Sequence, residues 1–430
     1  MLYFLLVFSL IICIYRGEVY ESNSGHWIFG PNANPCLEGW QGITCDQCSS
    51  NSQITCIVTE IILRDVNLIG TIPDEIILLT DVNNFGIVQN KGLVGSIPTV
   101  IGSMTRLTFL ALFKNKLTNI IPHSISELTL LKDLSIYSNK LSGTIPINIA
   151  KLSQLSVLQV AECQFTGSIP SSVGLLTKLN NLKIQNNRFS GLLPTTLGLL
   201  TNMESMDLGF NNITGPIPLE IGNMISLTEF DISFTQSNGP IPTTIALLTN
   251  LILLGLDNTL ISGTIPSELG KLVQLTRLFL CACKLSGTIP SELGALSSMV
   301  LFNIYRTKLS GSLPEALSGM TNTEYFNAHE SGLTGTIPSS FALMINMNGF
   351  EVQSNYLTGT IPPVFTTMLN LNYLYLDSNA FTGRLESMYP SVEFLRINNN
   401  FLTGPLVIPT TSNNMLLEYS ANNNLFTGTV

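Results

Sequence analysis

Apolar and polar positions follow one fixed order along most of the chain. A hexad of the form Leu-x-Gly-x-Ile-Pro recurs from Gly70 onward, and Asn119 replaces its glycine once. Between Gly95 and Gly383 the third position of the hexad returns every 24 residues. Chance spacing does not keep such a register over so long a stretch, so we interpret the chain as an array of structural repeats.

Each unit combines a strand signal with a turn signal. The order is Leu-x-x-Leu-x-Leu-x-x-Asn-x-Leu, as in Leu107, Leu110, Leu112, Asn115 and Leu117. The Leu-x-Leu pair has strand period and predicts two buried side chains on a short strand. The asparagine is expected to bond backbone groups where the chain leaves the strand, glycine tolerates a positive φ at the bend, and proline restricts φ after it. Each unit therefore predicts one turn of a solenoid.

The asparagine position predicts a buried ladder through the stacked coils. Asparagine occupies it at residues 90, 115, 139, 187, 211, 355, 379, 400 and 424, and small residues replace it at Cys163, Thr235, Thr259, Cys283, Thr307 and Ser331. We interpret Cys163 and Cys283 as buried structural thiols. Cys281 lies two residues before Cys283 and is expected on the solvent-exposed strand face, where it would be the thiol to test for reactivity.

The N-terminus begins with an apolar run, Leu2–Tyr15. A bilayer span needs about 20 apolar residues, so the run predicts a signal peptide over residues 1–18 and a secreted chain. An uncleaved signal anchor is the alternative, because no basic residue precedes the run and no small-x-small site follows it. No later stretch is long and apolar enough to span a membrane.

Four cysteines follow closely, namely Cys36, Cys45, Cys48 and Cys56. In an exported protein such crowding predicts two disulfides, with three possible pairings. A zinc site is the competing interpretation, but the spacing lacks two Cys-x2-Cys pairs. We predict a disulfide-bonded cap over residues 19–57 and a solenoid of about 15–16 coils over residues 58–430.

The hexad resembles that of the plant-type leucine-rich-repeat family, and the segment from Cys36 to Cys45 (CLEGWQGITC) resembles the N-terminal cap of that family. The resemblance implies an α/β repeat fold, a leucine-rich-repeat solenoid of 24-residue repeats with a parallel β-sheet on its concave face. It also implies receptor-like recognition of a protein, peptide or cell-wall glycan, in signalling or defence, with a possible membrane co-receptor. The location would be secreted or the outer face of the plasma membrane.

Two alternative functions remain open, and the sequence differs from the family pattern at two points. The chain could inhibit a secreted hydrolase, or it could be a fragment of a receptor kinase ectodomain. Cys48 and Cys56 exceed the usual cysteine pair of the cap. The step from Gly383 to Gly404 is 21 residues, which predicts an irregular coil.

Acidic residues are expected on the concave face, where such solenoids bind ligands. They are Asp207, Glu229, Asp231 and Asp257. Because neighbouring strands lie about 4.8 Å apart, Asp207 and Asp231 should be stacked. The group is interpreted as a solvated face, a patch for a basic partner, or a catalytic pair; an open sheet disfavours the last interpretation, because it does not exclude water.

Aromatic residues form a second candidate site. Tyr305, Tyr325, His329, Tyr373 and Tyr375 occupy expected lining positions, with Arg306, Glu330, Glu351 and Asp377 beside them. Exposed tyrosine supplies a large contact area at a low entropic cost. Scattered surface aromatics are the alternative interpretation. A smaller group, Phe109, Phe113 and Tyr137, lies nearer the N-terminus.

Composition limits the remaining functions. Charged residues make up 11% and hydrophobic residues 45% of 430 residues, and the net charge is −9. The chain is therefore not disordered, and nucleic acid is an unfavourable partner. The three histidines form no catalytic or metal-binding pattern and no phosphate loop is present, so neither an enzyme nor a cofactor is expected. Asn212-Ile213-Thr214 is the one glycosylation tripeptide.

Overall fold

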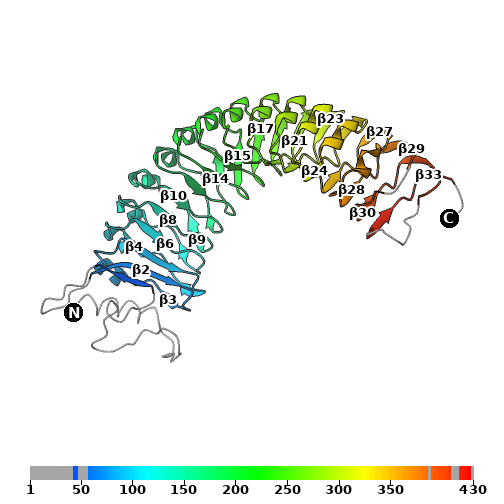
Figure 1. Ribbon diagram of the computed structural model, residues 1–430. Helices are drawn as coiled ribbons and strands as arrows, with labels where there is room; N and C mark the ends of the chain where they lie inside the picture. The colour runs from blue at the N-terminus through cyan, green and yellow to red at the C-terminus, as the bar shows by residue number, and fades with distance from the viewer. Residues whose placement is uncertain (1–41, 47–56, 386–388, 408–415, 428–430) are drawn as a thin grey trace. The chain divides into compact units, whose positions relative to one another are not determined.

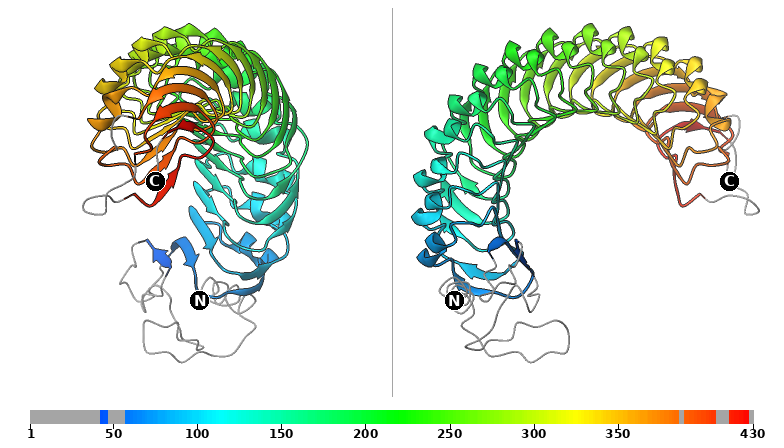
Figure 2. Two further views of the ribbon diagram at one scale, coloured as in Figure 1. Left: turned by 90° about the vertical axis from the view of Figure 1, so that its right-hand side faces the viewer. Right: turned by 60° about the vertical axis from the view of Figure 1, so that its left-hand side comes forward.

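The structure is a computed structural model that describes residues 42–46, 57–385, 389–407 and 416–427. The chain divides into two compact units, Met1–Ile213 and Thr214–Val430. Within each unit the chain winds into coils, and the strands in Figure 1 run side by side from one coil to the next. Short helices cover the outer side of the coils and the inner sheet lines the opposite side (Figure 2).

The inner sheet supplies the concave face of each unit. In the first unit its strands are β1 (Ile43–Cys45), β2 (Val58–Arg64), β4 (Asn84–Val88), β6 (Phe109–Ala111), β8 (Asp133–Ser135), β10 (Val157–Gln159), β12 (Asn181–Lys183) and β14 (Ser205–Asp207). In the second unit they are β16 (Glu229–Asp231), β18 (Leu253–Gly255), β20 (Arg277–Phe279), β22 (Leu301–Asn303), β24 (Tyr325–Asn327), β26 (Gly349–Glu351), β28 (Tyr373–Tyr375), β30 (Phe394–Arg396) and β32 (Glu418–Ser420).

The register of the inner sheet confirms the repeat length. The pairs are parallel, and Val157 pairs with Asn181, one 24-residue unit further on. Tyr373 pairs with Phe394 instead, a step of 21 residues, so the irregular coil keeps its place in the sheet. Among the described inner strands, only β1 makes an antiparallel pair: it pairs with β2, with Ile43 opposite Ile61.

A second set of strands follows the inner strands along each coil. Its members are β3 (Ile69–Thr71), β5 (Gly92–Val94), β7 (Thr118–Asn119), β9 (Lys140–Gly143), β11 (Gln164–Phe165), β13 (Ser190–Leu192), β15 (Asn212–Gly215), β17 (Gln236–Gly239), β19 (Leu260–Gly263), β21 (Lys284–Gly287), β23 (Lys308–Gly311), β25 (Gly332–Gly335), β27 (Tyr356–Thr360), β29 (Ala380–Arg384), β31 (Phe401–Gly404) and β33 (Leu425–Phe426).

The helices of the described chain are all short 3-10 turns that begin after the hexad proline. They are η1 (Asp74–Leu78), η2 (Thr99–Ser103), η3 (His123–Glu127), η4 (Ile147–Lys151), η5 (Ser171–Leu175), η6 (Thr195–Leu199), η7 (Leu219–Asn223), η8 (Thr243–Leu247), η9 (Ser267–Lys271), η10 (Ser291–Ala295), η11 (Glu315–Gly319), η12 (Ser339–Leu343) and η13 (Pro363–Thr366). The leucine-rich-repeat solenoid with parallel sheets is confirmed, with 3-10 helices in the helical part of each repeat.

The inward leucines form the core, as their spacing predicts. Leu107, Leu110 and Leu112 have no exposed surface. In the second unit phenyl rings replace leucines, and Phe326 stacks on Phe302 at 5.1 Å and on Phe350 at 5.4 Å between ring centroids. A continuous apolar column therefore holds successive coils together, since dispersion contacts add up across a close-packed core.

The predicted bend at the hexad glycine is confirmed. Gly143 has a φ of 80°, and Asn119, which replaces glycine in its coil, has a φ of 66°. A Cβ on Gly143 would lie 2.6 Å from Cγ2 of Ile120, so both conformation and space favour glycine there.

Each coil contains a second residue with a positive φ, which the sequence did not predict. It immediately precedes the ladder position and is not a glycine; Ser138, Arg306 and Glu330 have φ values of 53°, 51° and 47°. No residue type marks the position, but its fixed place before the ladder residue is a usable signal. The side chains at this position project from the bend beside the concave face.

The buried ladder is confirmed. Asn139 Oδ1 accepts the N–H of Leu117 at 3.0 Å, and its Nδ2 donates to the carbonyls of Leu112 at 2.8 Å and Ile136 at 3.0 Å. Each asparagine of this kind therefore satisfies backbone groups of its own coil and of the coil before it. These groups would otherwise be buried without partners.

The predictions for the N-terminal region are mostly outside the described residues. The signal peptide, Cys36, Cys48 and Cys56 all lie there. Cys45, at the end of β1, is disulfide-bonded. The cap boundaries and the disulfide pairing stay predictions. Among the described residues, no helix is long and apolar enough to cross a membrane.

Candidate functional site

The acidic residues lie on the inner sheet, as predicted, but they belong to two units. Asp207 ends β14 in the first unit, and its Oδ1 accepts the N–H of Gly209 at 3.1 Å. Glu229 and Asp231 are the two ends of β16, and Asp257 follows β18 in the second unit. The predicted stacking of Asp207 on Asp231 stays a prediction.

Local hydrogen bonds organise the acidic residues of the second unit. Asp231 Oδ1 accepts the N–H of Ser233 at 2.7 Å, and Asp257 Oδ1 accepts the hydroxyl of Ser233 at 2.5 Å. Burial raises the pKa of Asp231, and the neighbouring carboxylates of Asp257 and Glu229 raise it further. These carboxylates hold each other through Ser233 rather than flanking a cleft, so the geometry does not favour a catalytic pair.

The tyrosine residues occupy defined columns of the second unit. Tyr325, Gly349, Tyr373 and Phe394 are successive partners across the inner sheet. Asn327, Glu351, Tyr375 and Arg396 form the next column. Tyr305 and His329 follow their strands, β22 and β24, by two residues. The five predicted aromatic residues therefore share one face, although they do not form one contiguous cluster.

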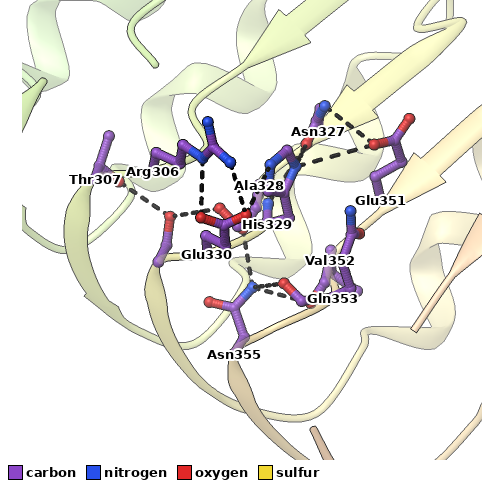
Figure 3. A network of polar contacts seen from close by, with 11 residues as sticks. Arg306, Thr307, Asn327, Ala328, His329, Glu330, Glu351, Val352, Gln353 and Asn355 are labelled. Carbon is purple, nitrogen blue, oxygen red and sulfur yellow. Dashed lines mark hydrogen bonds and ion pairs between the residues drawn. The ribbon is translucent and has the colours of Figure 1, made fainter. Parts of the chain in front are cut away.

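Tyr305 and His329 form the first aromatic group. Their rings stack with centroids 4.4 Å apart and an angle of 10° between the planes. Beside them Arg306 and Glu330, both at the left-handed bend, face each other from neighbouring coils (Figure 3). Arg306 Nε lies 2.9 Å from Glu330 Oε2, and Nη2 lies 3.2 Å from Oε1. This bidentate pair fixes two long side chains at the rim of the ring stack.

His329 is held between polar neighbours. Its Nδ1 lies 2.5 Å from Asn327 Oδ1 and 3.9 Å from Glu351 Oε2. Figure 3 shows the ring beside these two side chains. Burial lowers the pKa of His329, and it raises the pKa of Glu351. A histidine whose pKa is lowered, beside a carboxyl group whose pKa is raised, makes this part of the face sensitive to pH on the acidic side of neutrality.

The second aromatic group surrounds Tyr373. Tyr373 stacks on Phe394 with centroids 4.9 Å apart, and meets Tyr375 edge to face at 6.3 Å. Arg396 lies over the Tyr375 ring, 4.5 Å from its centroid, and binds Glu418 through Nε at 2.7 Å and Nη2 at 3.2 Å. We call Tyr305, His329, Tyr373, Tyr375, Phe394 and Arg396 the concave aromatic surface.

Phe394 and Arg396 were missed by the sequence prediction. They lie after the 21-residue step, where counting by 24 no longer finds the lining positions. Aligning the Leu-Arg-Ile segment of this coil with the Leu-x-Leu strand pattern would have found them. Tyr325 was predicted to belong to the aromatic site but does not join either ring stack. Its ring lies against Gly349 instead.

The aromatic residues of the first unit form a smaller feature. Phe113 and Tyr137 stack with centroids 4.6 Å apart and an angle of 6° between the planes. Phe109 lies at the start of β6. The stack resembles that of Tyr305 and His329 but has no bidentate arginine beside it among the described residues, which makes it a matched comparison.

The expectation for Cys281 is wrong. Its side chain is 3% exposed, and its thiol interacts with the side chain of Tyr305 in the next coil. Burial raises the pKa of the thiol to about 11. Cys283 is buried, as predicted, and its Sγ donates to the carbonyl of Leu256 at 3.0 Å. Cys163 is partly buried, and burial likewise raises its pKa to about 11.

The other candidate residues belong to neither of the two aromatic groups. The described part of the chain contains no group of three or more histidine, cysteine, aspartate or glutamate residues arranged to hold a metal ion. Asn212 is exposed at the start of β15, where a glycan could be attached. His123 begins η3, and His26 is outside the described residues.

Comparison with known proteins agrees with this geometry. The family model described as Leucine Rich Repeat matches residues 202–224 and 274–296. No curated protein sequence matches the chain. A solved plant peptide hormone receptor, RGFR1 in complex with RGF2, is 28% identical, with a TM-score of 0.75 over 90% of this chain and 72% of that chain.

Two further structures are similar. The TDR receptor is 30% identical, with a TM-score of 0.81, and the match covers 86% of this chain and 65% of that chain. PEPR1 with AtPEP1 is 27% identical, with a TM-score of 0.79, over 98% of this chain and 62% of that chain. The chain thus spans less than two thirds of the TDR and PEPR1 chains. Its repeat, its coil geometry and these matches together show that the chain is a leucine-rich-repeat solenoid similar to the RGFR1 and TDR receptor structures.

Proposed function

We propose that the second unit recognises an extended peptide along its concave aromatic surface. The observation that carries the proposal is the pair of ordered ring stacks, Tyr305 on His329 and Tyr373 on Phe394, on one face of the unit. The similarity of this chain to RGFR1, a plant peptide hormone receptor solved in complex with RGF2, supports it.

Rigidity of the surface favours recognition. Arg306 and Arg396 are each held by two contacts to a carboxylate, from Glu330 and Glu418. Stacking fixes the rings next to them. A ligand that binds such a surface orders few protein side chains, so less of its binding energy is lost to conformational entropy.

The setting that we propose is extracellular. It rests on the predicted signal peptide, on the cap with its four cysteines and on the candidate glycosylation site at Asn212. A membrane co-receptor belongs to the same proposal. Secretion of the full chain, the N-terminal sequence of the product and a mass shift on glycosidase treatment that Asn212→Gln abolishes would test these points separately.

Selection of peptides from a random display library on the secreted protein tests the function. Peptides selected on the wild type should bind Tyr305→Ala and Tyr373→Ala about tenfold or more weakly, since buried tyrosine anchors dominate interfaces. Phe113→Ala, which breaks the comparable stack of the first unit, is the control and should bind normally. Equal binding to all three variants at unchanged melting temperature would exclude the concave aromatic surface.

A further inference from the structure

A hollow of about 390 Å³ opens at the edge of the inner sheet in the second unit, where β24, β26 and β28 begin. Its lining combines the carboxylate of Glu324, the ring of Tyr325, the side chain of Leu369 and four asparagines. Its volume is at the small end of the roughly 300–1,000 Å³ that is typical of ligand pockets. It lies outside the concave aromatic surface defined above.

Two of the four asparagines have a structural role. Asn346 and Asn370 donate to the carbonyls of Thr321 and Ile345, each at 3.2 Å. Asn250 makes the same bond, to Ile225 at 3.0 Å, in a coil that does not line the hollow. The repeat therefore explains the Nδ2 groups of Asn346 and Asn370, and leaves their Oδ1 atoms available.

The repeat does not require the other polar residues. Glu324, Asn348 and Asn372 each directly precede an inner strand. Other coils of the unit fill this position with Thr228, Ile252, Thr276, Val300, Glu393 and Leu417. Only Asn348 has a side-chain bond that supports the coil, from Nδ2 to the carbonyl of Asn370 at 3.3 Å. In three adjacent coils this variable position thus carries an amide or a carboxylate group, and all three groups line the hollow with the ring of Tyr325.

Gly349 leaves the space that the ring of Tyr325 occupies. Its backbone is outside the left-handed region, so conformation does not demand a glycine. A Cβ at this position would lie 2.9 Å from Cδ1 and 3.3 Å from Cε1 of Tyr325. The missing side chain therefore lets the Tyr325 ring lie against the sheet, and the residue stays 38% exposed.

We propose that this hollow binds one or two units of a neutral oligosaccharide. The ring face of Tyr325 packs against the C–H face of a sugar, and the edge of Leu369 adds apolar contact. Amide and carboxylate oxygens accept hydrogen bonds from sugar hydroxyls, and amide N–H groups donate to them. Glu324 supplies a single negative charge, which disfavours an anionic sugar.

Titration of the full-length protein with cellotetraose, mannotetraose and N-acetylchitotetraose, followed by saturation-transfer NMR and calorimetry, tests the proposal. At least one neutral sugar should bind, and tetragalacturonate should bind more weakly. Tyr325→Ala and Gly349→Ala should each weaken binding about tenfold, the first by removing the ring and the second by displacing it. Asn250→Ala is the matched control and should leave binding unchanged.

Three results would overturn the proposal: no binding of any neutral sugar, binding of tetragalacturonate at least as tight, or unchanged binding by Tyr325→Ala. Asn348→Ala repeats the test should Gly349→Ala lower the melting temperature. Tyr373→Ala separates this site from the peptide surface, because it should weaken peptide capture and leave sugar binding intact. Failure of either proposal is therefore visible without failure of the other.

Discussion

Two stretches of the second unit build the same buried ladder from different side chains. Five successive coils use Thr235, Thr259, Cys283, Thr307 and Ser331, and the following coils use Asn355, Asn379, Asn400 and Asn424. Asn355 accepts the N–H of Leu333 at 3.1 Å and donates to Ala328 and Val352, both at 2.9 Å. Thr259 donates to Leu256 of its own coil at 2.7 Å and touches Cys283 Sγ at 3.3 Å.

The difference shows that the ladder does not set the shape of a coil. The residue before the ladder position is left-handed in both stretches, with a φ of 51° at Asn258 and 56° at Ser354. The ladder residue instead sets how strongly one coil is bonded to the coil before it. An amide spans both coils, while a threonine hydroxyl satisfies its own coil and meets its neighbour only through another ladder side chain.

The largest expected effect is that of Asn355→Ala. The substitution leaves the N–H of Leu333 and two carbonyls without partners in the core, which should cost about 3 kcal/mol. Hydrogen exchange of Leu333 and urea unfolding measure it. Asn322→Ala, which removes two exposed bonds, to Ser297 and from Asn346, is the control and should cost far less. Similar costs for both would show that the ladder is not the stabilising element.

Thr259→Ala should have a smaller effect. It removes the hydroxyl bond to Leu256, a long bond from the N–H of Ile261 and the contact with Cys283, which should together cost about 1 kcal/mol. Urea unfolding of this variant beside Thr259→Ser, which keeps the hydroxyl, isolates the bond. A cost as large as that of Asn355→Ala would remove the distinction between the two stretches.

The alkylation rates of the buried thiols provide a second test of the difference between the threonine and asparagine stretches of the ladder. Cys281 is buried and its pKa is raised to about 11, so roughly one thiol in a thousand is ionised at pH 8 and alkylation of the native protein should be slow. Thr259→Ala should accelerate alkylation of Cys283 about fivefold, because the free energy of local opening around this thiol falls. Asn355→Ala should not change this rate. Mass spectrometry of the labelled peptides gives both rates, and equal acceleration by both variants would contradict local opening.

The smallest expected effects concern pH. The pKa of His329 is lowered on folding, so the unfolded chain binds its proton more tightly and this region should lose stability as the pH falls below about 6.5. The pKa of Glu351 is raised, so the folded chain binds the proton more tightly and stability should fall as the pH rises through the range just above 4.5. Hydrogen exchange, corrected for intrinsic rates, should show acid loosening at His329 that His329→Gln abolishes. Persistence of that loosening in the variant would assign it to another group.

Sequence reasoning found the parts of the site that obey the repeat. Tyr305, His329, Tyr373 and Tyr375 were located by counting from the hexad glycine, and all four lie on the inner face. Phe394 and Arg396 were missed because the count fails across the 21-residue step. The exposure of Cys281 was predicted wrongly because an alternating strand pattern does not show that Tyr305 of the next coil packs beside the thiol.

The sequence by itself determined the coil. A 24-residue order of leucine, asparagine, glycine and proline sets which side chains are buried, where the chain bends and where a short helix begins, because these choices depend on residues close together in one repeat. Only the tertiary structure decided which side chains meet across coils. The stack of Tyr373 on Phe394, the pair of Arg306 with Glu330 and the seat of Tyr325 on Gly349 each join residues from separate coils. Such contacts depend on side-chain directions and on stacking in space, which no local pattern encodes.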